Sequence, residues 1–371
     1  MSNIVDELYN AIEAGRKGKN IGISTGLPKI DDFIGGIQKK TYYLLMGTSG
    51  AGKSSYALYS FIYRPLKDNP NGNFKIVYFS LEMSARKLLA KLLSLYLYET
   101  YSIVIPYKKL MSWQEILDSE TYNYVLKGKE WLNEITKKLV IYDKSLNRDS
   151  FYRTMMNVLE DEGRFEESED GFRKIYIPND PDKLILGVLD HVNLSQPKPG
   201  EDKKSEIDAI SARAVRLREV CGASFLFIQQ ENRNSASMDR RKADMTECSS
   251  EDLKDTGNTF NDCEVCIGVY FPLKHKLKTC HEYVIINDIK GDSFKGLRDR
   301  YRGLCLIKNR EGESEKYVSV NFFGEIGLFR ELPKADTISD YSPYMRLNHH
   351  KEENSEDEVL DKPKKELIYS F

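Results

Sequence analysis

The residues best suited to chemistry lie in one glycine-rich stretch. It reads Gly47-Thr48-Ser49-Gly50-Ala51-Gly52-Lys53-Ser54, followed by Ser55, and fits the phosphate-binding pattern G-x-x-x-x-G-K-[ST]. Glycines there let backbone N–H groups point at a β-phosphate, and a helix N-terminus adds positive potential. Lys53 would reach the β- and γ-phosphates, and the Ser54 hydroxyl would bind Mg²⁺. The stretch predicts a site for ATP and Mg²⁺, and its alternative is an ordinary glycine-rich turn.

Two carboxylates are candidates for the rest of this site because each follows a predicted strand. Asp190 ends the apolar run Leu184–Leu189 and is the candidate second ligand for Mg²⁺, although an Asp there can also cap a helix. Glu82 follows Lys75–Ser80 and is the candidate general base for an attacking water. Its alternative role is to stabilise the N-terminal end of the next helix. Ligands of parallel sheets bind at the carboxyl ends of strands, so we expect both carboxylates near Lys53.

The elements that must position these residues alternate between apolar strands and helical segments. The predicted strands are Tyr42–Met46, Lys75–Ser80, Lys138–Tyr142, Leu184–Leu189, Ser224–Gln229, Asp262–Tyr270, Tyr283–Asp288, Gly303–Ile307, Tyr317–Asn321 and Leu328–Arg330. This alternation predicts an α/β fold with a mainly parallel sheet flanked by helices and with antiparallel strands at the end.

The chain divides into three predicted parts. Residues 1–19 hold a short amphipathic helix with apolar side chains at helical spacing. Residues 20–332 form the α/β domain, in which the acidic stretch at about 161–180 is a predicted surface insertion. Residues 333–371 are polar and highly charged, so we expect an acidic, disordered tail. The apolar end of that tail, residues 367–371, either docks on a partner protein or packs on its own domain.

Composition excludes several classes of protein. The 371 residues carry 55 Lys and Arg against 57 Asp and Glu, a net charge of −2, so any nucleic-acid binding must come from local basic loops. No apolar run approaches the roughly 18 residues of a membrane span. The first 20 residues lack the apolar core of a signal peptide. We therefore expect a cytoplasmic protein.

The six cysteines lie between Cys221 and Cys305 and are expected to be reduced thiols. Cys263 and Cys266 form a C-x-x-C pair that is followed by Cys280-His281, a set that could ligate zinc. The pair lies in a predicted strand, where positions three apart face opposite sides. Buried thiols are therefore the favoured interpretation.

Several stretches, taken in order, resemble the DnaB-type replicative helicases, which are hexameric motors with a RecA-like P-loop NTPase core. Beside the phosphate-binding loop they are residues 25–31 (TGLPKID), 80–84 (SLEMS), 189–194 (LDHVNL), 228–233 (IQQENR), 252–257 (DLKDTG) and 308–312 (KNREG). His191 and Asn193 depart from the family pattern, which has D-Y-hydrophobic-Q there. The resemblance covers roughly residues 23–331. The family's helical N-terminal domain has no counterpart here, and residues 1–19 resemble only its linker helix, as in phage or mobile-element helicases.

The resemblance implies roles for particular residues. Gln230 matches the glutamine that senses the γ-phosphate, and Lys308 and Arg310 match the pair that reaches the nucleotide of a neighbouring subunit. Residues 252–257 match the loop that lines the central channel of the ring. The implied activity is ATP hydrolysis that drives 5′→3′ travel on single-stranded DNA and unwinding of duplex. The implied partners are single-stranded DNA, further copies of the chain, and a primase, polymerase, helicase loader or single-strand-binding protein.

Basic residues on the ligand side of the predicted sheet are candidate DNA contacts. The candidates that follow the strands at 184–189 and 224–229 are Lys198, Lys203, Lys204, Arg233, Arg240, Arg241 and Lys242. Such charges either contact DNA or are simply solvated. Lys254 and Asp255 are stronger candidates, because Gly257 nearby would let backbone amides approach a phosphate. These stretches contain no aromatic residues, so we expect little sequence preference.

A ring is also favoured by the residues themselves. A guanidinium stabilises phosphoryl charge when it is supplied by a neighbour, and the apolar face of the N-terminal helix stays exposed unless a neighbour covers it. Two alternatives share the fold: a RecA-like recombinase that forms filaments, and a nucleotide-dependent ring scaffold or loader-like subunit without motor activity.

Overall fold

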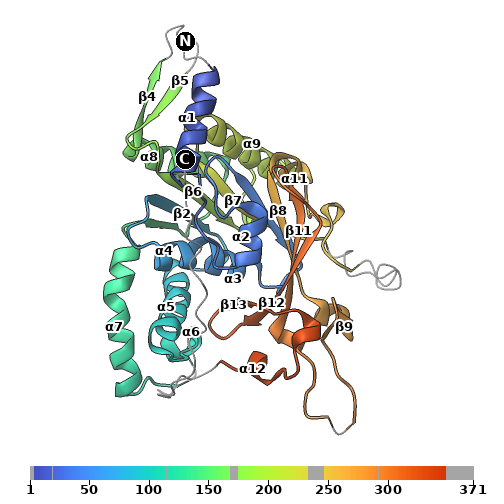
Figure 1. Ribbon diagram of the computed structural model, residues 1–371. Helices are drawn as coiled ribbons and strands as arrows, with labels where there is room; N and C mark the ends of the chain where they lie inside the picture. Colours follow the sequence, from blue (N-terminus) through green and yellow to red (C-terminus); the bar gives the residue numbers. More distant parts are fainter. Residues whose placement is uncertain are drawn as a thin grey trace, which may run out of the picture.

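A nine-stranded sheet forms the centre of the molecule in a computed structural model, which describes residues 4–18, 20–113, 115–167, 174–232, 246–290 and 292–347 (Figure 1). The strand order is β13-β12-β11-β8-β1-β7-β6-β2-β3. The strands are β1 (Tyr42–Gly47), β2 (Phe74–Ser80), β3 (Leu139–Tyr142), β6 (Leu184–Asp190), β7 (Ser224–Gln230), β8 (Val265–Tyr270), β11 (Tyr301–Asn309), β12 (Lys316–Phe323) and β13 (Leu328–Glu331). The strands from β8 to β3 are parallel, and β11, β12 and β13 are antiparallel. The predicted fold class is confirmed.

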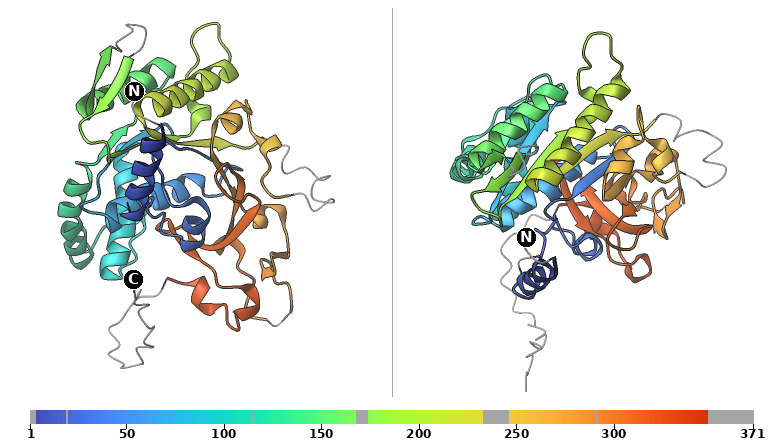
Figure 2. Two further views of the ribbon diagram at one scale, coloured as in Figure 1. Left: turned by 45° about the horizontal axis from the view of Figure 1, so that its top comes forward. Right: turned by 90° about the horizontal axis from the view of Figure 1, so that it is seen from above.

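Helices cover both faces of this sheet (Figure 2). One face carries α2 (Pro28–Ile34), α3 (Lys53–Ala57), η1 (Leu58–Tyr63), α4 (Arg64–Asp68), α5 (Ala85–Tyr101), α6 (Tyr107–Leu110) and α7 (Ser119–Ile135). The other carries α8 (Arg148–Asp161), α9 (Lys203–Cys221) and α11 (Asn258–Asp262). All residues of β1 and β6 are buried, as expected for central parallel strands with both faces covered.

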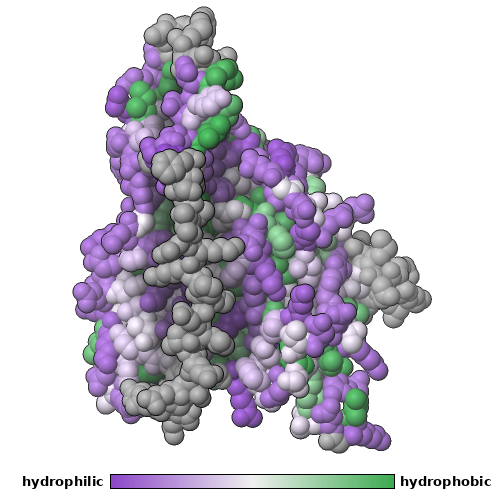
Figure 3. All heavy atoms as spheres, in the orientation of Figure 1, coloured by the Kyte–Doolittle hydropathy of each residue, from purple (hydrophilic) through white to green (hydrophobic). Residues whose placement is uncertain are grey.

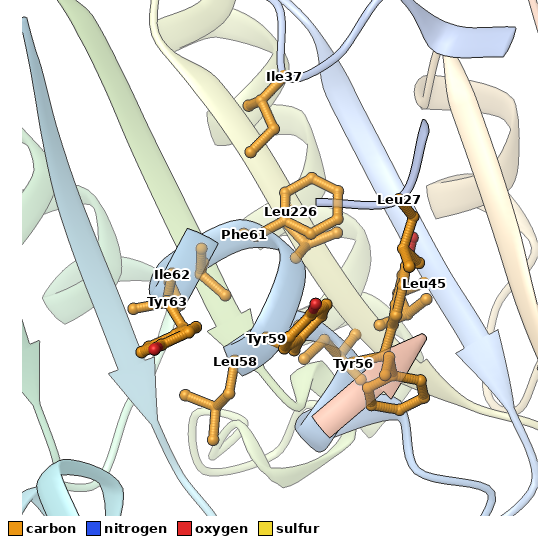
Figure 4. Packing of buried hydrophobic residues seen from close by; sticks show 14 of the residues in the cluster. Leu27, Ile37, Leu45, Tyr56, Leu58, Tyr59, Phe61, Ile62, Tyr63 and Leu226 are labelled. Atoms are coloured by element: carbon orange, nitrogen blue, oxygen red, sulfur yellow. The ribbon is translucent and has the colours of Figure 1, made fainter. Parts of the chain in front are cut away.

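Alternate side chains of β1 enter two separate cores. Tyr43 and Leu45 pack with η1 and α5, whereas Tyr42 and Leu44 pack with α8 and α9, because successive residues of a strand face opposite sides. Figure 4 shows the first of these cores, with side chains of α3 and η1 gathered against Leu45 of β1 and Leu226 of β7. This packing fixes α3, and therefore the phosphate-binding loop, against the sheet.

Two predicted strands differ from the structure. Residues 283–288 form no strand of the central sheet; only β10 (Tyr283–Val284) is extended, and it pairs with β9 (Thr279–Cys280) in a small hairpin. Its apolar side chains pack in a separate cluster with Leu297 and Tyr301, which gives the same apolar signal as a strand. The strand predicted from Asp262 begins at Val265, because α11 takes residues 258–262.

The acidic stretch at 161–180 lies in the connection from β3 through α8 to β6. There β4 (Gly163–Glu167) and β5 (Lys174–Pro178) pair as an antiparallel hairpin, which the sequence did not indicate. The buried Tyr176 hydroxyl donates to the Leu159 carbonyl at 3.0 Å, so α8 anchors this hairpin.

The two terminal segments behave differently. α1 (Ile4–Arg16) exposes apolar side chains, with Leu8 57% and Tyr9 66% exposed, and apolar side chains lie on the surface over it (Figure 3). Residues 333–347 do not form the predicted disordered tail: η7 (Ala335–Thr337) and α12 (Ser342–Met345) pack beside the β9–β10 hairpin, where Tyr341 stacks on Phe294. Residues 348–371 lie outside the described residues. Among the described residues, no helix is long and apolar enough to span a membrane.

Candidate functional site: a nucleotide cleft at the carboxyl edge of the sheet

The phosphate-binding loop joins β1 to α3 at the carboxyl ends of the parallel strands. Its first glycine, Gly47, has a φ of +149°, and a Cβ there would lie 2.5 Å from the Val269 carbonyl oxygen; glycine is therefore required at this position. Lys53 begins α3, and its Nζ donates to the carbonyls of Gly47 (2.7 Å) and Thr48 (3.0 Å). Burial lowers the pKa of the Lys53 ammonium.

The two predicted Mg²⁺ ligands lie together. The Ser54 hydroxyl donates to Oδ1 of Asp190 at 2.9 Å, and the Tyr78 hydroxyl donates to Oδ2 at 2.7 Å. Asp190 is fully buried, and burial raises the pKa of its carboxyl, while the two hydroxyls oppose that shift. Both oxygens thus accept from side-chain hydroxyls and not from helix N–H groups, so the helix-cap alternative has no support. The oxygens of Ser54 and Asp190 fit a hard cation such as Mg²⁺.

An open cleft of about 1000 Å³ lies beside this pair. It is lined by Ser49, Gly50, Gly52, Lys53, Ser54, Ser55, Glu82, Met83, Lys87, Lys91, His191, Gln230, Phe322 and Gly324. Glu82 therefore faces the same space as Lys53. It precedes Ser84, the N-cap of α5, so it lies outside the first helical turn where its alternative role would place it. The cleft brings together four predicted residues: Lys53, Ser54, Glu82 and Gln230.

Sequence reasoning missed several cations near the cleft. Lys87 and Lys91 lie four residues apart on α5, so they share one face of that helix. Arg302 is buried under the loop, where its Nε donates to the Ala51 carbonyl at 2.6 Å and its guanidinium lies 3.5 Å from the centre of the Phe271 ring. Burial lowers the pKa of Arg302 to about 9. The one available signal for Arg302 was a charge at the start of an apolar strand.

Gln230 is tied to the segment predicted to contact DNA. The Gln230 N–H donates to Asn193 Oδ1 (2.9 Å), and the Lys254 N–H donates to the Gln230 carbonyl (3.0 Å). Asn193 Nδ2 donates in turn to Asp255 Oδ2 at 2.7 Å. Asn193, which departs from the family pattern, therefore connects Gln230 to residues 254–255.

The candidate DNA contacts have different surroundings. Lys254, Asp255 and Lys204 are exposed. Gly257 has a φ of −92°, and a Cβ there would meet nothing within 4 Å, so the argument that this backbone needs glycine is wrong. Lys203 donates to the Ser195 carbonyl, and Lys198 pairs with Asp149 at 2.8 Å. The remaining candidates lie outside the described residues: Arg233, Arg240, Arg241 and Lys242.

Lys308 and Arg310 lie at the opposite edge of the sheet from the phosphate-binding loop. β11 runs antiparallel to β8, so its last residue, Asn309, pairs with Val265, the first residue of β8. Lys308 Nζ donates to the Phe260 carbonyl (2.5 Å), and Arg310 donates to the Asn261 carbonyl (2.6 Å). Neither side chain lines the cleft of its own chain.

The cysteines do not form the suggested zinc set. Cys263 and Cys266 are buried in the core shared by α8 and α9, whereas Cys280 lies in the cluster beside the β9–β10 hairpin. Cys263 precedes β8 and donates to the Phe260 carbonyl at 3.3 Å, so the strand argument does not apply to it. The preferred interpretation, buried thiols, agrees with this placement.

Comparison with known proteins gives the family. The model of the DnaB-like helicase C terminal domain matches residues 22–331. The structure is similar to the solved ATPase domain of a DnaB-like helicase (TM-score 0.66, 17% identity, 90% of this chain and 100% of that chain). It is also similar to a DnaB-like replicative helicase described with its interactions with primase (TM-score 0.65, 17% identity, 90% of this chain and 68% of that chain). No curated protein matched the sequence. The two structures support the RecA-like fold, and the family match over residues 22–331 shows that the chain belongs to the DnaB-like helicases.

Proposed function

We propose that this chain is the motor of a replicative DNA helicase, which hydrolyses ATP as a homohexameric ring and travels 5′→3′ on single-stranded DNA to unwind duplex. The observation that carries the proposal is the separation of two sets of residues. Lys53, Ser54, Glu82 and Gln230 face one cleft with Asp190 beside it, and the pair at 308 and 310 lies at the other edge of the sheet.

Within one cleft the residues divide the reaction among them. Lys53 binds the β- and γ-phosphates, and Ser54 and Asp190 hold Mg²⁺, which supplies positive charge where the transferred phosphoryl develops negative charge. Glu82 accepts the proton of the attacking water. Gln230 hydrogen-bonds the γ-phosphate and so changes its contacts when that phosphate leaves.

The remaining cation must come from a neighbouring subunit. The six residues of β8 separate the two edges by about 20 Å at roughly 3.3 Å per residue, so Arg310 cannot reach the cleft of its own chain. A head-to-tail contact that repeats around a closed ring brings this edge of one chain to the cleft of the next. The exposed apolar face of α1 supports the same arrangement, since a neighbour would cover it.

Lys254 and Asp255 are the proposed link between ATP and DNA. One backbone hydrogen bond joins Lys254 to Gln230, and Asn193 contacts both segments. A shift of Gln230 on loss of the γ-phosphate would therefore move the exposed Lys254 side chain, which contacts the DNA backbone without reading bases. The proposed further partners, a primase, polymerase, loader or single-strand-binding protein, would dock at the surface of the ring or at the tail.

The test is unwinding of a forked duplex with a single-stranded 5′ arm, compared with a fork that has only a 3′ arm. We expect ATP-dependent unwinding of the first fork and no activity with the Glu82→Gln variant. A closed ring that hydrolyses ATP but separates neither fork would favour the scaffold alternative. Filaments on single-stranded DNA would favour the recombinase.

A further inference from the structure

One cluster of metal-ligating side chains lies away from the nucleotide cleft. Cys280 Sγ, His281 and a carboxylate oxygen of Glu247 offer ligand atoms that all lie within 4.8 Å of one another. Nε2 of His281 lies 2.7 Å from Oε1 of Glu247. Among the described residues this is the group of three such side chains that could surround one ion. We propose that it is a zinc site.

The three donors suit Zn²⁺ in type, number and charge. Zinc binds thiolate, imidazole and carboxylate at about 2.0 to 2.3 Å, so tetrahedral ligand atoms are separated by about 3.3 to 3.5 Å. The ligand atoms of Cys280, His281 and Glu247 need to move by only about 1 Å to meet this geometry. A thiolate, a carboxylate and a neutral imidazole balance the two positive charges of the ion, and a water completes the four ligands. The sulfur favours zinc over Mg²⁺, which the nucleotide cleft selects by oxygen donors.

The surroundings of the cluster resemble a second shell around a metal. The Tyr317 hydroxyl lies 3.5 Å from Cys280 Sγ, and the Tyr301 hydroxyl lies 3.3 Å from that of Tyr317 and 2.9 Å from Ser319 Oγ. Hydroxyls that donate toward a bound sulfur hold it in place and tune its charge. The His281 ring stacks on the Tyr317 ring with centroids 3.6 Å apart, which fixes the plane of the imidazole.

The backbone at His281 adds an independent observation. His281 and Glu282 form the two-residue loop of the β9–β10 hairpin, with φ of +44° and +70°. Turns of this kind favour Asn-Gly, because side chains beyond Cβ are disfavoured at positive φ. Residues in such conformations cluster at functional sites, and here the turn directs Cys280 and His281 to the same side as Glu247.

Burial shows how the ion could enter. Cys280 is buried, whereas the side chains of His281 and Glu247 are 43% and 45% exposed. Zn²⁺ would therefore bind from solvent onto a sulfur held inside the cluster that contains Leu297 and Tyr301. Bound zinc would join the hairpin, which lies between β8 and β11 in the chain, to the segment that contains Glu247, beside the antiparallel end of the sheet (Figure 1).

The test measures Zn²⁺ binding to the whole chain. Protein is stripped with a chelator and titrated with Zn²⁺ against a chromogenic competitor, and Co²⁺ is used as a spectroscopic probe of thiolate ligation. We expect one Zn²⁺ per chain and a thiolate-to-Co²⁺ charge-transfer band. Cys280→Ser should remove the band and weaken Zn²⁺ binding by more than the roughly 10- to 100-fold that loss of an outer-shell partner costs.

Two further variants and one control complete the design. His281→Asn and Glu247→Gln should each weaken binding by a similar factor, and Asn suits a positive φ, so the first keeps the hairpin. Cys221→Ser, a half-buried thiol on α9, should leave the stoichiometry and the band unchanged. Zn²⁺ affinity that is equal in Cys280→Ser and the parent chain would overturn the proposal, as would less than one equivalent bound. In either case the His281–Glu247 contact is only a surface hydrogen bond.

Discussion

Tyr78→Phe tests the geometry around the predicted Mg²⁺ ligand without touching the ion or the nucleotide. The Tyr78 hydroxyl donates to Asp190 Oδ2 at 2.7 Å inside a fully buried environment. A hydrogen bond to a charged group contributes about 1.5 to 3 kcal/mol, and loss of an outer-shell partner weakens metal binding by about 10- to 100-fold. We therefore expect the Mg²⁺ concentration that gives half-maximal ATPase to rise by about 10- to 100-fold, with the rate at saturating Mg²⁺ largely kept.

The effect has a pH signature with a definite sign. The Tyr78 hydroxyl opposes the rise in the pKa of Asp190 that burial causes, so its removal raises that pKa further. Mg²⁺ binds the ionised carboxylate, and protons compete with it as the pH falls. The excess Mg²⁺ requirement of Tyr78→Phe over the parent chain should therefore grow toward acid pH.

Tyr42→Phe is the matched control. Tyr42 is also fully buried, and its hydroxyl lies 3.0 Å from Ser211 Oγ, but it packs in the core on the other face of the sheet. Both variants should lose a similar stability, about 1 kcal/mol for one hydrogen bond, measured by urea unfolding. If the two variants show the same Mg²⁺ dependence, Tyr78 does not position Asp190 for the ion.

Three further predictions concern single residues. Lys53→Ala should abolish phosphate release while circular dichroism shows a folded protein, because it removes charge at the phosphates; undiminished turnover would contradict the role of the loop. Glu82→Gln should still bind ATP but hydrolyse it more slowly by on the order of 100-fold or more, and lost ATP affinity would instead indicate a structural role. Lys254→Ala should lower the slope of log affinity for single-stranded DNA against log salt by about 0.7, equally for all sequences. Lys137→Ala, whose parent lysine pairs with Glu134 on α7, should leave that slope unchanged.

What the sequence could predict was local in the chain. The strand, the phosphate-binding loop and the helix that begins at Lys53 are consecutive, so one motif defines them together. Asp190 and Glu82 follow the same logic, since each lies at the end of a buried strand and parallel strands end at one edge of a sheet. The resemblance to a known family then supplied Gln230, which the structure places in the same cleft.

What the sequence could not predict depends on contacts between distant segments. Tyr78 looks like an ordinary core residue, and its role appears only because Ser80 pairs with Asp190 in the register of β2 and β6. Arg302 lies far along the chain from Ala51, whose carbonyl it contacts. The apolar run from Tyr283 has the same composition whether it joins the sheet or packs outside it, so no periodicity could separate the two cases.

The split between Lys53 at one edge of the sheet and Arg310 at the other is the central claim, and mixed rings test it most directly. Arg310→Ala and Lys53→Ala should each be inactive alone, because each lacks one half of every site. In a randomly mixed ring with equal amounts of both, about one quarter of the sites combine an intact Lys53 with an intact Arg310 of the next subunit. Lys53→Ala mixed with the double variant forms no such site and is the control.

The measurement is the steady-state ATPase rate of these mixtures after assembly with single-stranded DNA. We expect the mixture of Arg310→Ala with Lys53→Ala to recover up to about one quarter of the parent rate, while the control mixture stays inactive. A mixture no more active than its components, or an Arg310→Ala protein that is fully active alone, would contradict the shared site and with it the proposed ring.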